Sequence, residues 1–141
     1  MEPTHSLMEP TPKNGQGSRP TCLIVEDHAR VRTALREWLM GVFPGCHFLA
    51  VGSGEEAIAL ANSHAFDVIL MDIGLPGMSG LEATRRIKQV LPRVRVVILT
   101  LYDTMEYRAE AGAAKANAYV LKQTMTTELV PLLKSLLPGH P

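Results

Sequence analysis

The chain has 141 residues, of which 46% are hydrophobic, so it can bury one substantial core and is long enough for a single domain. Lys and Arg together number 14, as do Asp and Glu, so no basic field is available to bind nucleic acid. No apolar run is long enough to span a bilayer. The two cysteines, Cys22 and Cys46, lack the spacing of a metal or redox motif. This absence favours reduced, buried thiols in a cytoplasmic protein.

The first twenty residues contain four prolines among polar residues and no apolar stretch. This composition indicates a flexible tail over residues 1–20 and argues against a signal peptide. We expect one folded domain over residues 21–137 and a short tail at residues 138–141. No second domain fits in what remains.

From Cys22 onward, short apolar runs alternate with amphipathic segments. Cys22–Val25 is predicted to be a strand that ends at Glu26-Asp27. The helix expected next has one apolar face and ends before Pro44-Gly45, after which His47–Val51 is predicted to be the second strand. The apolar residues of that helix face are Val31, Leu35, Trp38, Leu39 and Val42.

The pattern repeats in the middle of the chain. Ser53 followed by Glu56 has the spacing of a capping box and predicts the start of the second helix. The third strand is expected at Asp67–Met71, followed by a turn over Gly74–Gly80. The residues that we expect the second helix to bury are Ala57, Ile58, Leu60 and Ala61.

A third predicted helix, Leu81–Leu91, ends at Pro92, and the fourth strand, Val94–Leu99, leads into Thr100. We expect this helix to bury Leu81, Ile87, Val90 and Leu91. The remaining elements are a helix from Asp103 or Thr104 to about Ala114, the strand Ala116–Leu121 and a last helix with leucines at helical spacing. Pro131 is compatible with the last helix only if that helix begins near Thr127, because the first turn has spare N–H groups.

A strand followed by a helix, five times over, predicts an α/β fold with a five-stranded parallel sheet and helices on both faces. In such sheets, the functional residues lie just beyond the carboxyl ends of the strands. The residues at four of these ends are Glu26-Asp27, Asp72, Thr100 and Lys122.

These strand-end residues suggest one chemistry. Three carboxylates in a small space repel one another, and a hard divalent cation, usually Mg²⁺, removes that conflict. An ammonium group and a hydroxyl group facing the same point suit a tetrahedral oxyanion. The sequence therefore predicts a site for a phosphoryl group beside a metal ion.

With these motifs in place, residues 21–137 resemble the receiver domains of two-component response regulators. The matching features are the acidic pair Glu26-Asp27, the turn from Asp72 to Gly80, Thr100, Tyr119 and Lys122. The segments Leu99–Asp103 and Ala118–Lys122 are most similar to receivers that precede LuxR-type (NarL-type) DNA-binding domains. The resemblance implies the flavodoxin-like (βα)5 fold that is also called CheY-like.

The resemblance also implies a role for each matching residue. Asp72 would accept a phosphoryl group from a histidine kinase or phosphotransfer protein. The chain would then be a phosphoacceptor signalling domain and not an enzyme. Asp27, Asp72 and the carbonyl of Gly74 would bind Mg²⁺, with Glu26 acting through a metal-bound water. Lys122 and Thr100 would contact phosphoryl oxygens, and Tyr119 would turn inward as Thr100 moves.

At the level of the whole protein, the resemblance implies a surface that switches, formed by the fourth helix, the fifth strand and the fifth helix. A homodimer could form through that surface on phosphorylation. Neither nucleic acid nor membrane is an expected partner of these residues. Whether the chain is a stand-alone receiver or the receiver part of a DNA-binding regulator stays open at this point.

Two departures from the family pattern are present. Lys115 occupies a position where similar receivers usually have a glycine suited to a left-handed helix end, which implies strain or a different turn. Gln123 follows Lys122 where many receivers have a proline. Neither departure removes a group that the chemistry needs.

Two alternative functions share part of this pattern. A phosphatase of the haloacid dehalogenase kind also uses an aspartate at a strand end, but it needs a second acid where this chain has Gly74, and the pair Glu26-Asp27 has no place in its scheme. A flavin- or nucleotide-binding module would need a glycine-rich loop after the first strand, and the turn there is acidic.

Overall fold

The computed structural model describes residues 19–139, so the expected tails at 1–20 and 138–141 lie largely outside the described residues. Five parallel strands form one sheet in the order β2-β1-β3-β4-β5, which confirms the predicted α/β architecture. The strands are β1 (Thr21–Val25), β2 (His47–Val51), β3 (Val68–Met71), β4 (Arg95–Thr100) and β5 (Ala118–Leu121). The helices are α2 (Ala29–Val42), α3 (Gly54–Ala61), α4 (Gly80–Val90), α5 (Met105–Ala113), a 3₁₀ turn η1 (Lys122–Thr124) and α6 (Met125–Leu136).

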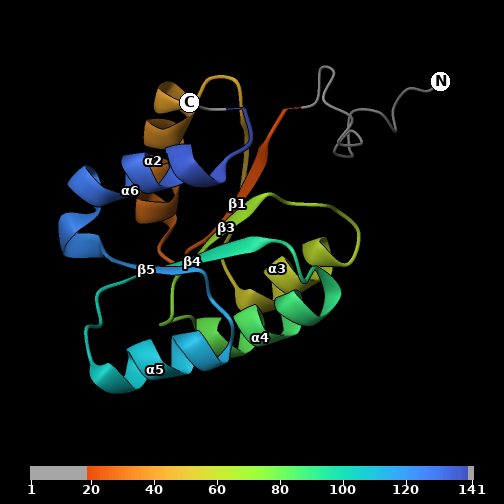
Figure 1. The fold of residues 1–141 in the computed structure, drawn as a ribbon, viewed down its shortest axis with the longest axis vertical. Helices are drawn as coiled ribbons and strands as arrows, with labels where there is room; N and C mark the ends of the chain where they lie inside the picture. Colours follow the sequence, from red (N-terminus) through yellow and green to blue (C-terminus); the bar gives the residue numbers. More distant parts are fainter. Residues whose placement is uncertain (1–18, 140–141) are drawn as a thin grey trace.

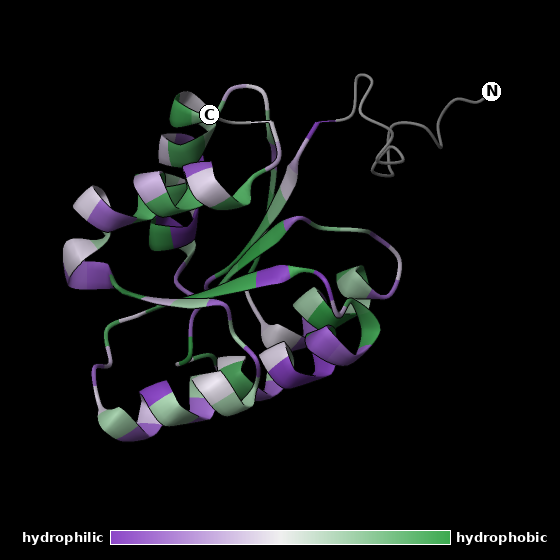
Figure 2. Cartoon of the chain, viewed as in Figure 1, coloured by the Kyte–Doolittle hydropathy of each residue, from purple (hydrophilic) through white to green (hydrophobic). Residues whose placement is uncertain are grey.

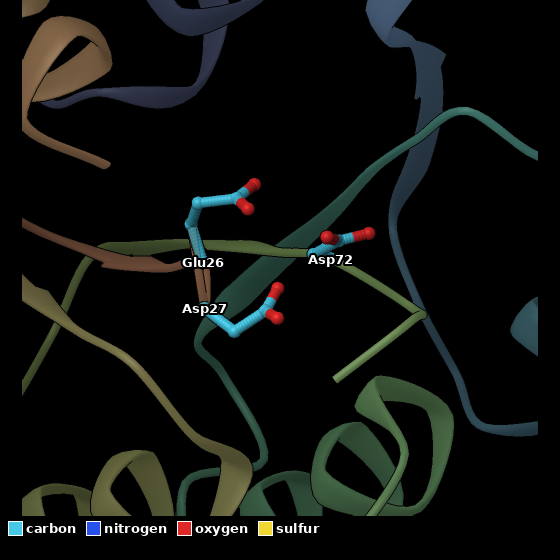
Figure 3. Close-up of side chains that lie close together, drawn as sticks. All are labelled: Glu26, Asp27 and Asp72. Atoms are coloured by element: carbon cyan, nitrogen blue, oxygen red, sulfur yellow. The ribbon is translucent and has the colours of Figure 1, made fainter. Parts of the chain in front are cut away.

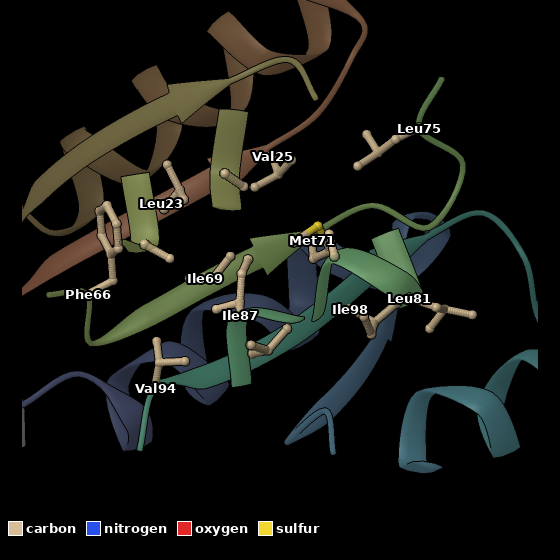
Figure 4. Close-up of a cluster of buried hydrophobic side chains, with 14 of the residues drawn as sticks. Leu23, Val25, Phe66, Ile69, Met71, Leu75, Leu81, Ile87, Val94 and Ile98 are labelled. Atoms are coloured by element: carbon tan, nitrogen blue, oxygen red, sulfur yellow. The ribbon is translucent and has the colours of Figure 1, made fainter. Parts of the chain in front are cut away.

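The helices cover the sheet in two layers: α2 and α6 on one face, and α3, α4 and α5 on the other (Figure 1). Successive residues of a strand point to opposite faces, so Leu23 and Val25 enter the core under α3 and α4, whereas Cys22 and Ile24 enter the other. Figure 4 shows the first of these cores, to which Ile69 of β3 contributes its side chain. Colouring by hydropathy shows apolar strands between helices with polar outer faces, as expected for a sheet buried on both sides (Figure 2).

Three helices begin with a hydroxyl cap. The side chains of Ser53, Ser79 and Thr104 each accept a hydrogen bond from the backbone N–H three residues later. Such a cap stabilises a helix by about 1 kcal/mol. The predicted cap at Ser53 is thus confirmed, although Glu56 accepts the reciprocal hydrogen bond from Gly52 N–H, at 2.9 Å, and not from Ser53.

Two apolar residues that were expected to be buried are exposed. Val42 and Val90 are 37% and 46% exposed, and each is the last residue of its helix. Beyond these positions the backbone leaves the helical conformation, which turns the next side chain toward the core. Phe43, only 1% exposed, therefore takes the core position expected for Val42.

The start of the last helix was also predicted wrongly. Helix α6 begins at Met125 and not near Thr127, so Pro131 lies inside it. The ring removes the hydrogen bond that the carbonyl of Thr127 would have accepted. Because Thr127 and Pro131 are both exposed, water can serve that carbonyl.

Lys115 has the strained conformation that its position predicts. Its φ is 72°, the only positive φ of a non-glycine residue among residues 19–139. Its N–H donates to Gly112 O at 3.0 Å and Ala116 N–H donates to Ala111 O at 2.9 Å, which is the Schellman arrangement at the end of α5. Gln123, the other departure, lies in η1.

Candidate functional site

Three carboxylates meet at the carboxyl edge of the sheet. Val25 pairs with Met71 in the parallel ladder of β1 and β3, so the residues that follow them leave the sheet side by side. Glu26, Asp27 and Asp72 each offer an oxygen within 4.8 Å of the others. Figure 3 shows the two side chains from the end of β1 beside the one from the end of β3.

Lys122 supplies the positive charge in this cluster. Its Nζ lies 2.7 Å from Glu26 Oε1 and 3.3 Å from Asp72 Oδ2. Burial opposes the charged ammonium and would lower its pKa, but the hydrogen bond to Glu26 and the charges of Asp72 and Glu26 raise the pKa of Lys122 above its usual value. Lys122 therefore remains charged and bridges two carboxylates.

The carboxylates differ in how tightly they are held. Glu26 is only 3% exposed, and its second oxygen accepts a hydrogen bond from His28 N–H at 3.1 Å. Asp72 is 8% exposed, and its Oδ1 accepts from Gly74 N–H at 3.3 Å. Asp27 is exposed, although one of its oxygens lies within 4.8 Å of an oxygen of Glu26 and of Asp72.

The turn after Asp72 folds back against it. A Cβ atom on Gly80 would lie 1.8 Å from the Asp72 carbonyl oxygen, so no larger residue fits without a backbone shift. Gly80 N–H donates to Ile73 O at 3.0 Å, and Met78 N–H donates to Glu55 Oε2 at 3.2 Å. The start of α4 thereby packs directly against the backbone of Asp72.

On the other side of the site, Thr100 and Tyr119 both bond to Tyr102. The buried Thr100 Oγ1 accepts from Tyr102 N–H at 3.2 Å, and Tyr119 Oη donates to Tyr102 O at 2.6 Å. The guanidinium of Arg108 lies 4.5 Å from the centre of the Tyr119 ring. Burial raises the pKa of Tyr119, and the charge of Arg108 opposes that rise.

Tyr102 was not singled out from the sequence. Its ring packs over Gly74, where a Cβ atom would lie 3.4 Å from Tyr102 Oη. Its side chain is 47% exposed, so the ring lies between Gly74 and solvent. Its place in the sequence could have indicated a role in the site, because Tyr102 lies two residues after Thr100, where the chain leaves the edge of the sheet.

The structure thus brings Glu26, Asp27, Asp72 and Lys122 together and places Gly74 next to Asp72. Thr100 ends β4, next to β3 in the sheet, and Tyr119 joins the site through Tyr102. The roles of these residues stay predictions at this point.

Comparison with known proteins identifies the family. A profile of the response regulator receiver domain matches residues 22–134, so the chain belongs to the receiver domains of two-component signalling. The response regulator UvrY of Escherichia coli is 34% identical over 119 residues, which cover 84% of this chain and 54% of UvrY. The chain spans about half the length of the curated relatives that it matches.

Solved structures agree with this assignment. A LuxR-family response regulator from Aurantimonas is 33% identical with a TM-score of 0.78, covering 87% of this chain and 88% of that one. The response regulator TrrA of Thermotoga maritima, solved with Mg²⁺ and beryllium fluoride, is 31% identical with a TM-score of 0.74, covering 84% of this chain and 99% of that one.

Family membership makes the chain a phosphoacceptor signalling domain with the CheY-like fold and not an enzyme, which removes the phosphatase alternative. It also implies a cognate histidine kinase. None of the helices within residues 19–139 is long and apolar enough to cross a membrane.

Proposed function

We propose that Asp72 is the aspartate that accepts the phosphoryl group. The observation that carries the proposal is the contact between Lys122 Nζ and Asp72 Oδ2 at 3.3 Å, inside a cluster of three carboxylates at the end of β3. Asp27 and Glu26 follow β1, where the neighbouring strand leaves the sheet. Asp72 is the one carboxylate that the strand order places in the middle of the edge, between β1 and β4.

The residues present suit a hard divalent cation. Carboxylate and carbonyl oxygens are the ligands that Mg²⁺ prefers, and Asp27, Asp72 and the Gly74 carbonyl would hold it, with Glu26 acting through a water. Both oxygens of Glu26 already accept hydrogen bonds, which supports an indirect role for it. When bound, the ion would neutralise negative charge where phosphate and carboxylate meet.

In the transfer step, an Asp72 carboxylate oxygen forms a bond to phosphorus while the bond from phosphorus to the kinase histidine nitrogen breaks. The electron pair of the broken bond stays on that nitrogen. Lys122 would then pair with a phosphoryl oxygen, and the Thr100 hydroxyl would donate to another. Positioning and charge neutralisation supply most of the catalysis in phosphoryl transfer, so few residues are needed.

The response to phosphorylation would pass through Tyr102. Thr100 and Tyr119 bond to its N–H and its carbonyl oxygen, so a shift of Thr100 toward a phosphoryl group loosens the contact that holds Tyr119. The surface that changes would comprise α5, β5 and α6, and a homodimer would form there. The relatives include DNA-binding regulators, so we propose that the domain serves as the cytoplasmic receiver of such a regulator.

The experiment compares two aspartates at the same edge of the sheet. Asp72→Asn should reduce labelling by acetyl phosphate with Mg²⁺ to background, measured on phosphate-affinity gels. Asp103→Asn is the matched control, because Asp103 is exposed and pairs with Arg108 outside the carboxylate cluster. Retained labelling of Asp72→Asn would refute the proposal.

A further inference from the structure

Arg32 reaches from the first turn of α2 back to the end of β1. Its Nη1 donates to the carbonyl oxygen of Glu26 at 2.8 Å and lies 3.4 Å from the carbonyl oxygen of Asp27. The side chain is half-buried, so the guanidinium is partly withdrawn from water at these carbonyls. It touches the backbone of two of the three clustered acids and none of their carboxylates.

For Asp27 this contact stands alone. Within residues 19–139, the contact with Arg32 Nη1 is the only hydrogen bond of Asp27. Glu26 is held at several further atoms, since its N–H donates to Val51 O at 3.0 Å and both carboxylate oxygens accept hydrogen bonds. Arg32 is therefore the side chain that joins the exposed acid of the cluster to the buried one.

The guanidinium also fills the space between two loops. A Cβ atom on Gly52, which follows β2, would lie 2.9 Å from Arg32 Nη1. Glycine at position 52 leaves the room that the guanidinium occupies. Arg32 thus lies between the loop that carries Glu26 and Asp27 and the loop that leaves the edge strand β2.

We propose that Arg32 is a positioning residue for the metal site: it orients the peptide groups of Glu26 and Asp27 so that their carboxylates converge on one cation. The proposal rests on the metal site described under Proposed function. Residues that orient metal ligands from outside the coordination sphere commonly control affinity, because a free ligand must lose its mobility when the ion binds.

The positive charge of Arg32 repels a cation, so a purely electrostatic role predicts tighter metal binding when the charge is removed. A positioning role predicts the opposite sign. The direction of the change in affinity therefore separates the two roles.

The test is a titration of the folded chain with Mn²⁺, followed by the electron paramagnetic resonance signal of the free ion, with Mg²⁺ as competitor. Arg32→Met is expected to weaken binding by about 10-fold, as is usual when a residue that orients ligands is lost. Arg36→Met is the matched control, because Arg36 on the same helix donates to a backbone carbonyl, that of Phe48, at 2.7 Å. Its affinity should equal that of the wild type.

Arg32→Lys keeps the charge but loses the rigid planar guanidinium whose Nη1 contacts both carbonyls, and should weaken binding by about 3-fold. Thermal unfolding of each variant shows whether it folds. If Arg32→Met does not fold, the metal affinity of Arg32→Lys provides the test. Unchanged or tighter binding in the Arg32 variants would overturn the inference. Absence of Mn²⁺ and Mg²⁺ binding by the wild type would overturn the metal site itself, and the inference with it.

Discussion

The two sides of the site are built differently. On the β1–β3 side, Glu26 and Asp72 are 3% and 8% exposed, and Lys122, which follows β5, extends across to bond to both carboxylates. On the β4–β5 side, Tyr102 is 47% exposed, and single hydrogen bonds connect it to Thr100 and Tyr119. The first side is held through buried, charged contacts, whereas the second is held through a few contacts near the surface.

This difference matches two tasks. Phosphoryl transfer needs groups that are already in place, because reorganisation during the reaction raises the barrier. A signal needs an element with two arrangements that differ little in free energy. The exposed residues near the second side, Leu101, Tyr102 and Met105, are consistent with a loop whose contacts can be exchanged.

The largest expected effect comes from the rigid side. Lys122→Met removes the cation that faces Asp72, and we expect phosphorylation by acetyl phosphate to slow about 100-fold, as when a charge-stabilising donor is lost. Mg²⁺ affinity should be retained or increase, because a nearby positive charge is gone. Rapid quenching gives the rate and Mg²⁺ titration the affinity; a variant as fast as the wild type would contradict the predicted role.

The same substitution should also change how the free energy of unfolding depends on pH. Because the folded-state pKa of Lys122 is raised, its ion pairs contribute fully to the free energy of unfolding below the unfolded value of about 10.4. That contribution is lost as the pH rises through the folded-state pKa. Urea unfolding between about pH 8 and 11 should therefore show a smaller alkaline loss in Lys122→Met than in the wild type.

A pair of glycine substitutions measures how closely the rigid side is packed. In Gly80→Ala the new methyl group would meet the Asp72 carbonyl at 1.8 Å, and we expect a loss of about 3 kcal/mol in unfolding free energy. In Gly112→Ala, within α5, nothing lies within 4 Å, and alanine should stabilise the helix by about 1 kcal/mol. Urea unfolding measures both, and similar values for the two variants would contradict the close packing of the turn after Asp72.

The smallest effect is expected at the exposed side. Tyr119→Phe removes the hydrogen bond to Tyr102 O and should cost about 1 kcal/mol in unfolding free energy, with an unchanged rate of phosphorylation. Tyr107→Phe is the control, since its hydroxyl makes no hydrogen bond with residues 19–139. A tenfold slower phosphorylation in Tyr119→Phe would show that the two sides are not separable.

The element boundaries show where the sequence was informative. Hydroxyl caps follow a local rule, so the helix start at Ser53 was predicted correctly. The end of a helix depends on where the chain turns back toward the core, which is why Val42 and Val90 were predicted buried and are exposed. Helix α6 starts directly after η1, a 3₁₀ turn that no short sequence pattern predicted.

The same distinction applies to the site. The sequence alone determined the order of strands and helices along the chain and the polar residues at the strand ends, because both depend on patterns within a few residues. Only the tertiary structure decided that Lys122 bonds to Glu26, 96 residues away, that Arg32 lies against Gly52, and that Tyr102 covers Gly74. Such contacts depend on the reach of side chains between loops that meet only when the sheet has formed.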